Sequence, residues 1–167
     1  ASYTSAIETL GMVRRDRLAS IAVGQFSFRE TVEPVYRELV RLLLLPEDAS
    51  QEALAQARNV VEELQLAEME NYFRSACIDA ATEAIDKLDT AAAVVYPIVL
   101  PDRIEVVMSL PNQPLRHYRT WQTEEETNRV IGGFYRYLNP VFSEDQRLSL
   151  SKKIYDWLIA HADVSLN

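Results

Sequence analysis

A stretch near the middle of the chain alternates apolar and polar side chains, whereas most of the remaining sequence has helical spacing. It runs from residue 96 to residue 118 and reads YPIVLPDRIEVVMSLPNQPLRHY. Alternation with a period of two places successive side chains on opposite faces of a strand. Pro101-Asp102 suits the centre of a tight turn, and PNQP at 111–114 supplies a second turn. The stretch therefore predicts a three-stranded antiparallel β-meander at about residues 91–122.

Each strand of this meander has a predicted role. Pro97 removes a ladder donor, which marks the first strand as an edge strand or a bulge. The second strand is expected at 104–110, with one face in the core and the other, which carries Glu105, Val107 and Ser109, half covered. The third strand is expected at 115–121. It presents Leu115, His117, Arg119 and Trp121 on one face and Arg116, Tyr118 and Thr120 on the other.

Helical spacing surrounds the meander on both sides. Apolar residues predict a helix over 31–45 that ends at Pro46, because proline cannot continue a helix. A second helix begins after Ser50, a suitable N-cap. The apolar spacing restarts out of phase at Leu66, which predicts a break near Gln65 and two helices in place of one.

Two further helices are marked by reciprocal capping patterns downstream of the meander. Thr123 with Glu126 and Ser143 with Gln146 each have the spacing at which both side chains satisfy free amide donors. The order of helices, meander and helices predicts a mostly helical α+β fold, with the meander packed against helices. We expect residues 1–167 to form one domain or a fragment of a longer protein, and residues 1–27 to be a possible connector from upstream helical repeats.

Charge is concentrated in one part of the chain. Eleven acidic and three basic residues lie between residues 47 and 89, and this segment accounts for the formal net charge of -8. An acidic surface repels a phosphate backbone and anionic lipid, so nucleic acid and membrane are disfavoured as partners. No run of apolar residues is long enough to span a bilayer. The single cysteine, Cys77, excludes an intramolecular disulfide, and a reducing cytoplasmic setting is expected.

Catalytic chemistry has few candidates in this sequence. Cys77 with His117 or His161 is the available pair of nucleophile and base, but Cys77 continues the apolar stripe of a predicted helix and is expected to be a buried structural residue. No histidine shares a helical face with the carboxylates at a spacing that binds metal. The four glycines do not form a phosphate-binding loop. We therefore expect no catalytic, cofactor-binding or metal site.

Four blocks of sequence, in order, resemble the segment that precedes the catalytic core of bacterial CHAT proteins, which are caspase- and separase-like and often carry tetratricopeptide repeats. The blocks read FRETVEPVYRELVRLLL (28–44), LQLAEMENYFRSACID (64–79), VVYPIVLPDRIEVVMSLPNQPLRHY (94–118) and KKIYDWLIA (152–160). In that family the catalytic motifs are of the types H-x-x-H-G and S-A-C-x-T, in that order. SAC occurs here at 75–77, but Asp79 stands in the place of the threonine and the cysteine precedes both histidines.

The resemblance implies a non-catalytic structural and protein-interaction module that flanks a caspase-like core. Its candidate contact groups are Arg103, Arg116 and Tyr118, on a polar face of the meander, together with an open edge strand. One alternative is part of a cysteine peptidase whose His/Cys dyad lies downstream. Another is a helical adaptor that dimerises. The expected partners are proteins: the caspase-like core and the helical repeats of the parent chain, or another protein.

Overall fold

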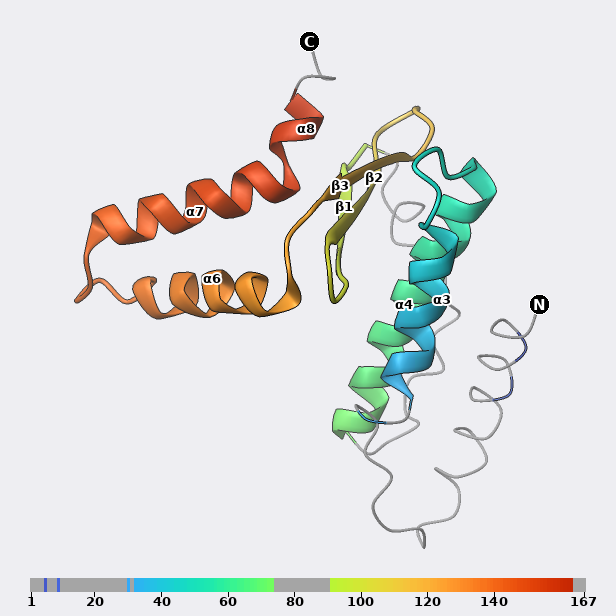
Figure 1. Ribbon diagram of the computed structural model, residues 1–167, viewed down its shortest axis with the longest axis horizontal. Coiled ribbons are helices and arrows are strands. Elements are labelled where there is room, and N and C mark those ends of the chain that lie inside the picture. Colours follow the sequence, from blue (N-terminus) through green and yellow to red (C-terminus); the bar gives the residue numbers. More distant parts are fainter. Residues whose placement is uncertain (1–4, 6–8, 10–29, 31, 74–90, 164–167) are drawn as a thin grey trace, which may run out of the picture. The chain divides into compact units, whose positions relative to one another are not determined.

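In the computed structural model, helices and one antiparallel sheet account for most of the described chain, which comprises residues 5, 9, 30, 32–73 and 91–163 (Figure 1). This confirms the α+β fold class. The chain divides into two compact units. One contains Ala1–Val94 and Ser109–Leu115, and the other contains Val95–Met108 and Arg116–Asn167. The predicted connector at 1–27 and the environment of Cys77 lie outside the described residues.

The described helices of the first unit form a hairpin. Helix α3 (Glu33–Leu43) begins with proline in its first turn, where the missing amide proton costs nothing, and ends shortly before Pro46. It buries Tyr36, Leu39 and Val40 and lies beside α4 (Gln51–Phe73) in Figure 1. Ser50 accepts a hydrogen bond from the amide of Ala53 at 3.2 Å, as its predicted N-cap role requires.

Helix α4 is continuous, so the expected break near Gln65 is wrong. The buried stripe continues from Leu64 to Ala67, which is fully buried, whereas Met69 is 48% exposed. A step of three residues keeps the helical phase. Ala67 therefore makes the core contact in this turn of the helix, although the apolar pattern favoured the larger side chains of Leu66 and Met69.

The turn that leads into the third strand also belongs to the first unit. The amide of Gln113 donates to the carbonyl of Leu110 at 3.2 Å, and Asn112 has φ of 57°. Asparagine tolerates this left-handed conformation at the third position of a type II turn. Just beyond, the side-chain amide of Gln51 donates to the carbonyl of Leu115 at 2.8 Å and accepts from its amide at 2.9 Å. Gln51 thus pairs with the backbone as a neighbouring strand does.

The sheet has the strand order β1-β2-β3, as the meander requires. The strands are β1 (Val94–Val99), β2 (Ile104–Ser109) and β3 (Arg116–Thr120). The amide of Leu100 donates to the carbonyl of Arg103 at 2.8 Å, which closes the first turn around Pro101-Asp102. Pro97 lies in β1, an edge strand, as predicted. The second face of β2, expected to be half covered, is instead buried at Glu105 and Val107.

The second unit ends in helix α6 (Glu124–Tyr137), helix α7 (Glu144–Leu158) and the short α8 (Ala160–Asp163). Both predicted N-caps are confirmed, because Thr123 accepts from the amide of Glu126 at 3.3 Å and Ser143 accepts from the amide of Gln146 at 3.5 Å. The Glu126 carboxylate binds Arg129 at 2.7 Å and lies 3.9 Å from Lys153 on α7. Figure 1 shows α6 and α7 side by side. Among the described helices, none is both long enough and apolar enough to cross a bilayer.

Two adjacent glycines in α6 provide a matched test of helix stability. An added methyl group at Gly132 meets nothing within 4 Å, whereas at Gly133 it meets Leu150 Cδ1 at 3.3 Å. Replacing glycine with alanine in a helix interior gains about 0.5–1 kcal/mol when space is open. We expect Gly132→Ala to raise the free energy of unfolding by that amount and Gly133→Ala to raise it less. Urea unfolding followed by circular dichroism measures both, and an equal gain would contradict the close approach of Leu150.

Candidate functional site

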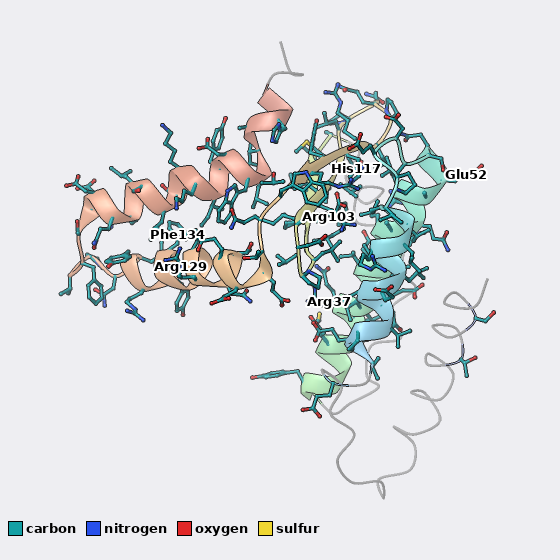
Figure 2. All side chains as sticks on the ribbon, in the orientation of Figure 1. Arg37, Glu52, Arg103, His117, Arg129 and Phe134 are labelled. Carbon is teal, nitrogen blue, oxygen red and sulfur yellow. The ribbon has the colours of Figure 1, made fainter. Side chains whose placement is uncertain are left out.

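Strand β2 places a carboxylate, Glu105, where its side chain has no solvent exposure. Cross-strand pairing sets Glu105 opposite Arg119, and Val107 opposite His117, so these side chains share one face of the sheet. Arg103 precedes Glu105 by two residues and lies on the same face. Arg103, Glu105, His117 and Arg119 are called the Glu105 cluster below, and Figure 2 shows Arg103 and His117 at the strands.

Hydrogen bonds reach both oxygens of the Glu105 carboxylate. Arg103 Nε donates to Oε1 at 2.5 Å, and Arg119 Nε donates to the same oxygen at 3.0 Å. His117 Nε2 lies 2.7 Å from Oε2. A buried carboxylate is tolerated only when such partners compensate its lost hydration. The cluster therefore ties β3 to β2, because a slip of one residue would turn its members to opposite faces.

Two opposing effects act on the pKa of Glu105. Burial raises the pKa because it disfavours the charged form. Hydrogen bonds from His117 and Arg103 and the charges of His117 and Arg119 lower it and prevail, so the pKa lies below the ordinary value of 4.5. Glu105 is therefore ionised in the folded protein at neutral pH.

The lowered pKa predicts a loss of stability in acid. A carboxyl group with a lower pKa when folded contributes stability that is complete above its unfolded pKa and disappears as pH falls through the folded pKa. We expect the free energy of unfolding of wild type to approach that of Glu105→Gln as pH falls below about 4.5. Urea unfolding of both proteins from pH 7 to about pH 3 measures this. A difference that stays constant over the range would contradict an ionised, hydrogen-bonded Glu105.

Arg103 has a further set of neighbours. Its Nη1 donates to both carboxylate oxygens of Asp102, at 3.0 and 3.1 Å. Its Nη2 is buried and has no hydrogen-bond partner in the structure. The ring of Trp121, which is 68% exposed, lies 6.0 Å from the Arg103 guanidinium carbon and 5.5 Å from that of Arg119. Arginine and tryptophan at this separation attract each other through the ring quadrupole.

The opposite face of β3 carries Arg116, Tyr118 and Thr120, which pair with Met108, Val106 and Ile104. The Tyr118 ring stacks on His161 of α8 with centroids 5.9 Å apart. Thr120 Oγ1 donates to the carbonyl of Trp157 at 3.3 Å. These contacts pack the end of the helical hairpin against this face of the sheet. The Tyr118 hydroxyl is buried and has no hydrogen-bond partner in the structure.

The structure separates the three contact residues that the sequence suggested. Arg103 is 3% exposed and lies in the Glu105 cluster, whereas Arg116 and Tyr118 are half-buried on the other face. The three do not share one polar face. The expectation failed for Arg103 because it lies one residue before β2 and has the same parity as Glu105. Arg116 and Tyr118 remain together on edge strand β3.

The chemistry of the Glu105 cluster is electrostatic. His117 Nε2 is bound to Glu105, and His161 stacks on Tyr118. Within residues 32–73 and 91–163, no group of three or more His, Cys, Asp or Glu side chains is arranged to hold a metal ion. Cys77 lies outside the described residues, so its pairing with either histidine stays untested.

The Glu105 cluster was not predicted, although the sequence carries a signal for it. Arg103 and Glu105 are two residues apart, as are His117 and Arg119, and the PNQP turn lies midway between the two pairs. Opposite charges at period-two spacing on both sides of a turn predict cross-strand ion pairs on one face. The pattern is visible only when the two strands are compared across the turn.

Comparisons with known proteins returned no relative of this chain. A scan against protein-family models and searches of curated proteins and of solved structures each found no match.

Proposed function

We propose that this chain is a non-catalytic protein-interaction module that binds protein along edge strand β3. The observation that carries the proposal is that β3 is partly exposed and pairs with a strand on one side only. All five residues of β3 are half-buried, and the strand leads directly into the exposed ring of Trp121. Within the described residues, β3 has β2 on one side and no strand on the other. An edge strand of this kind binds an extended segment through its backbone amides and carbonyls.

The other edge of the sheet is less suited to this role. Strand β1 contains Pro97, which has no amide proton to offer an added strand. Strand β3 contains no proline. The Glu105 cluster fixes the register of β3 and makes it a rigid template, which lowers the entropic cost of binding. Arg116, Tyr118 and Trp121 are of residue types that contribute strongly at protein interfaces, and they supply side-chain contacts along this edge.

The partner that we propose is a caspase-like core of the CHAT type. The support for this part is the resemblance of four sequence blocks to the segment that precedes such a core. A module of this kind joins helical repeats to the core and positions it.

A binding measurement tests the proposal. Where the gene encodes further residues after residue 167, that stretch is expressed separately and titrated with this chain by calorimetry. Because tryptophan at the centre of an interface often contributes 2 kcal/mol or more, we expect Trp121→Ala to weaken binding by roughly 30-fold. Tyr72→Ala is the matched control, since Tyr72 is an aromatic residue on α4 that is 80% exposed.

Several outcomes would contradict this function. Equal binding by wild type and Trp121→Ala would exclude the β3 edge, and a parent gene without a caspase-like core would exclude the proposed partner. A thiol-reactive peptide provides a further test. If it alkylates Cys77 in the native protein faster than it alkylates free cysteine, a non-catalytic role is contradicted, because an activated thiolate reacts faster than an ordinary thiol.

A further inference from the structure

We propose that the hairpin of α6 and α7 is one half of a four-helix bundle and that a second copy of this chain supplies the other half. This surface is separate from the β3 edge, and the inference does not depend on the proposed function. Two helical hairpins that pack face to face are a common route to a four-helix bundle. The support comes from the exposed apolar surface of the hairpin, its extent and its charge pattern.

An apolar stripe runs along the exposed side of α6. Ile131, Tyr135 and Leu138 follow at steps of four and three residues, the spacing of one helix face, and are 46%, 78% and 50% exposed. Val141 and Phe142 continue it in the loop, at 86% and 44% exposed. These five residues are called the α6 stripe. The steps between Ile131, Tyr135 and Leu138 match those of a seam between packed helices.

The hairpin itself does not provide a cover for this stripe. Helix α7 contains no buried residue, and α6 buries only Thr127 and Val130. Phe134 lies on the side of α6 toward α7, where Gly133 approaches Leu150 (Figure 2). Two helices form a single layer, and a stable helical architecture needs a second layer over its apolar side.

The extent of the stripe suits a dimer interface. Aromatic side chains bury roughly 150–250 Å² each, and the two aromatic members of the stripe, Tyr135 and Phe142, are 78% and 44% exposed. Together with the exposed aliphatic members Ile131, Leu138 and Val141, they leave uncovered an area on the order of half the roughly 800 Å² that each partner buries in a standard interface. Leu148 and Tyr155 of α7, at 56% and 41% exposed, add to this surface.

The charge pattern of α6 favours an antiparallel second copy. Its first turn is acidic, with Glu124, Glu125 and Glu126, and its last turn carries Arg136. A twofold axis across α6 sets the first turn of each copy beside the last turn of the other, so acidic and basic residues meet twice. The segment 47–89, in contrast, carries the entire net charge of -8 and would repel its own copy. Charge therefore directs self-association to the hairpin.

Sedimentation velocity of the whole chain tests the dimer. Between about 1 and about 300 µM, where interfaces of moderate strength assemble, we expect the mass to rise from 19.1 kDa toward twice that value. Tyr135→Glu places a charge in the stripe, and we expect it to raise the dimer dissociation constant by at least about tenfold. Tyr72→Glu is the matched control, because Tyr72 on α4 is 80% exposed and Tyr135 is 78% exposed. It should leave the dissociation constant unchanged.

A charge exchange tests the antiparallel arrangement. Arg136→Glu should weaken the dimer by about two- to fivefold, as expected for exposed ion pairs, and adding Glu125→Arg should restore it. Val141→Asp in the loop provides a second disruption of the stripe that cannot act through helix stability. A monomer at every concentration, a dimer unaffected by both stripe variants, or equal weakening by Tyr72→Glu would overturn the proposal. No effect of Arg136→Glu would overturn its antiparallel geometry.

Discussion

Glu105→Gln is expected to lower the free energy of unfolding by about 3–5 kcal/mol, the range found when one partner of a buried ion pair is removed. The variant keeps the shape of the side chain but leaves the Arg103 and Arg119 guanidiniums in the interior without their common carboxylate. It also places an amide beside His117. Urea unfolding at pH 7 measures the loss.

An exposed ion pair provides the control for this effect. Glu38 accepts two hydrogen bonds from Arg41, at 2.6 and 2.7 Å, but both side chains are about one-third exposed. Surface pairs contribute about 0–1 kcal/mol, so Glu38→Gln should have a small effect. If Glu105→Gln lowers the free energy of unfolding no more than Glu38→Gln does, the Glu105 carboxylate is not a buried partner of Arg103 and Arg119.

Gln65→Pro is expected to cost about 3 kcal/mol or more, because proline within a helix removes a hydrogen bond and clashes with the preceding turn. Gln65 is an exposed residue well inside α4, which runs without a break from Gln51 to Phe73. The cost therefore arises from the backbone and not from lost side-chain packing. Thermal unfolding followed by circular dichroism measures it.

Gln65→Ala separates the backbone effect from the loss of the glutamine side chain. Alanine is compatible with a helix, and an exposed substitution of this kind changes stability by at most about 0.5 kcal/mol. A proline variant that is as stable as the alanine variant would mean that a helix ends near residue 65, as the apolar spacing alone suggested.

Local signals predicted the elements whose determinants lie within a few residues. The N-caps Thr123 and Ser143 mark the starts of α6 and α7, and Pro101-Asp102 marks the first turn of the sheet. These predictions are confirmed because a cap or a turn satisfies its hydrogen bonds with its own neighbours. The break in α4 was wrong because Ala67 is too small to stand out in an apolar pattern.

Long-range pairing was less accessible from the sequence. The bond between Gln51 and Leu115 joins residues 64 positions apart, and neither side chain suggests it. The burial of Glu105 depends on the register of β2 against β3, which brings Arg119 and His117 to its side chain and is not contained in the pattern of either strand alone. The alternation of β2 predicts that the face with Glu105 is half covered, yet a carboxylate with three cationic or imidazole partners can be buried.

Amide hydrogen exchange of residues 116–120 tests the central claim, that β3 is a docking edge, most directly. Exchange is compared between this chain alone and this chain in the presence of the proposed partner, a caspase-like core. Strand pairing protects amides according to the free energy of opening, so amides of β3 that point away from β2 should exchange at least about tenfold more slowly when the partner is bound. The amides of β1 serve as the internal reference. Unchanged exchange throughout β3 would contradict the account.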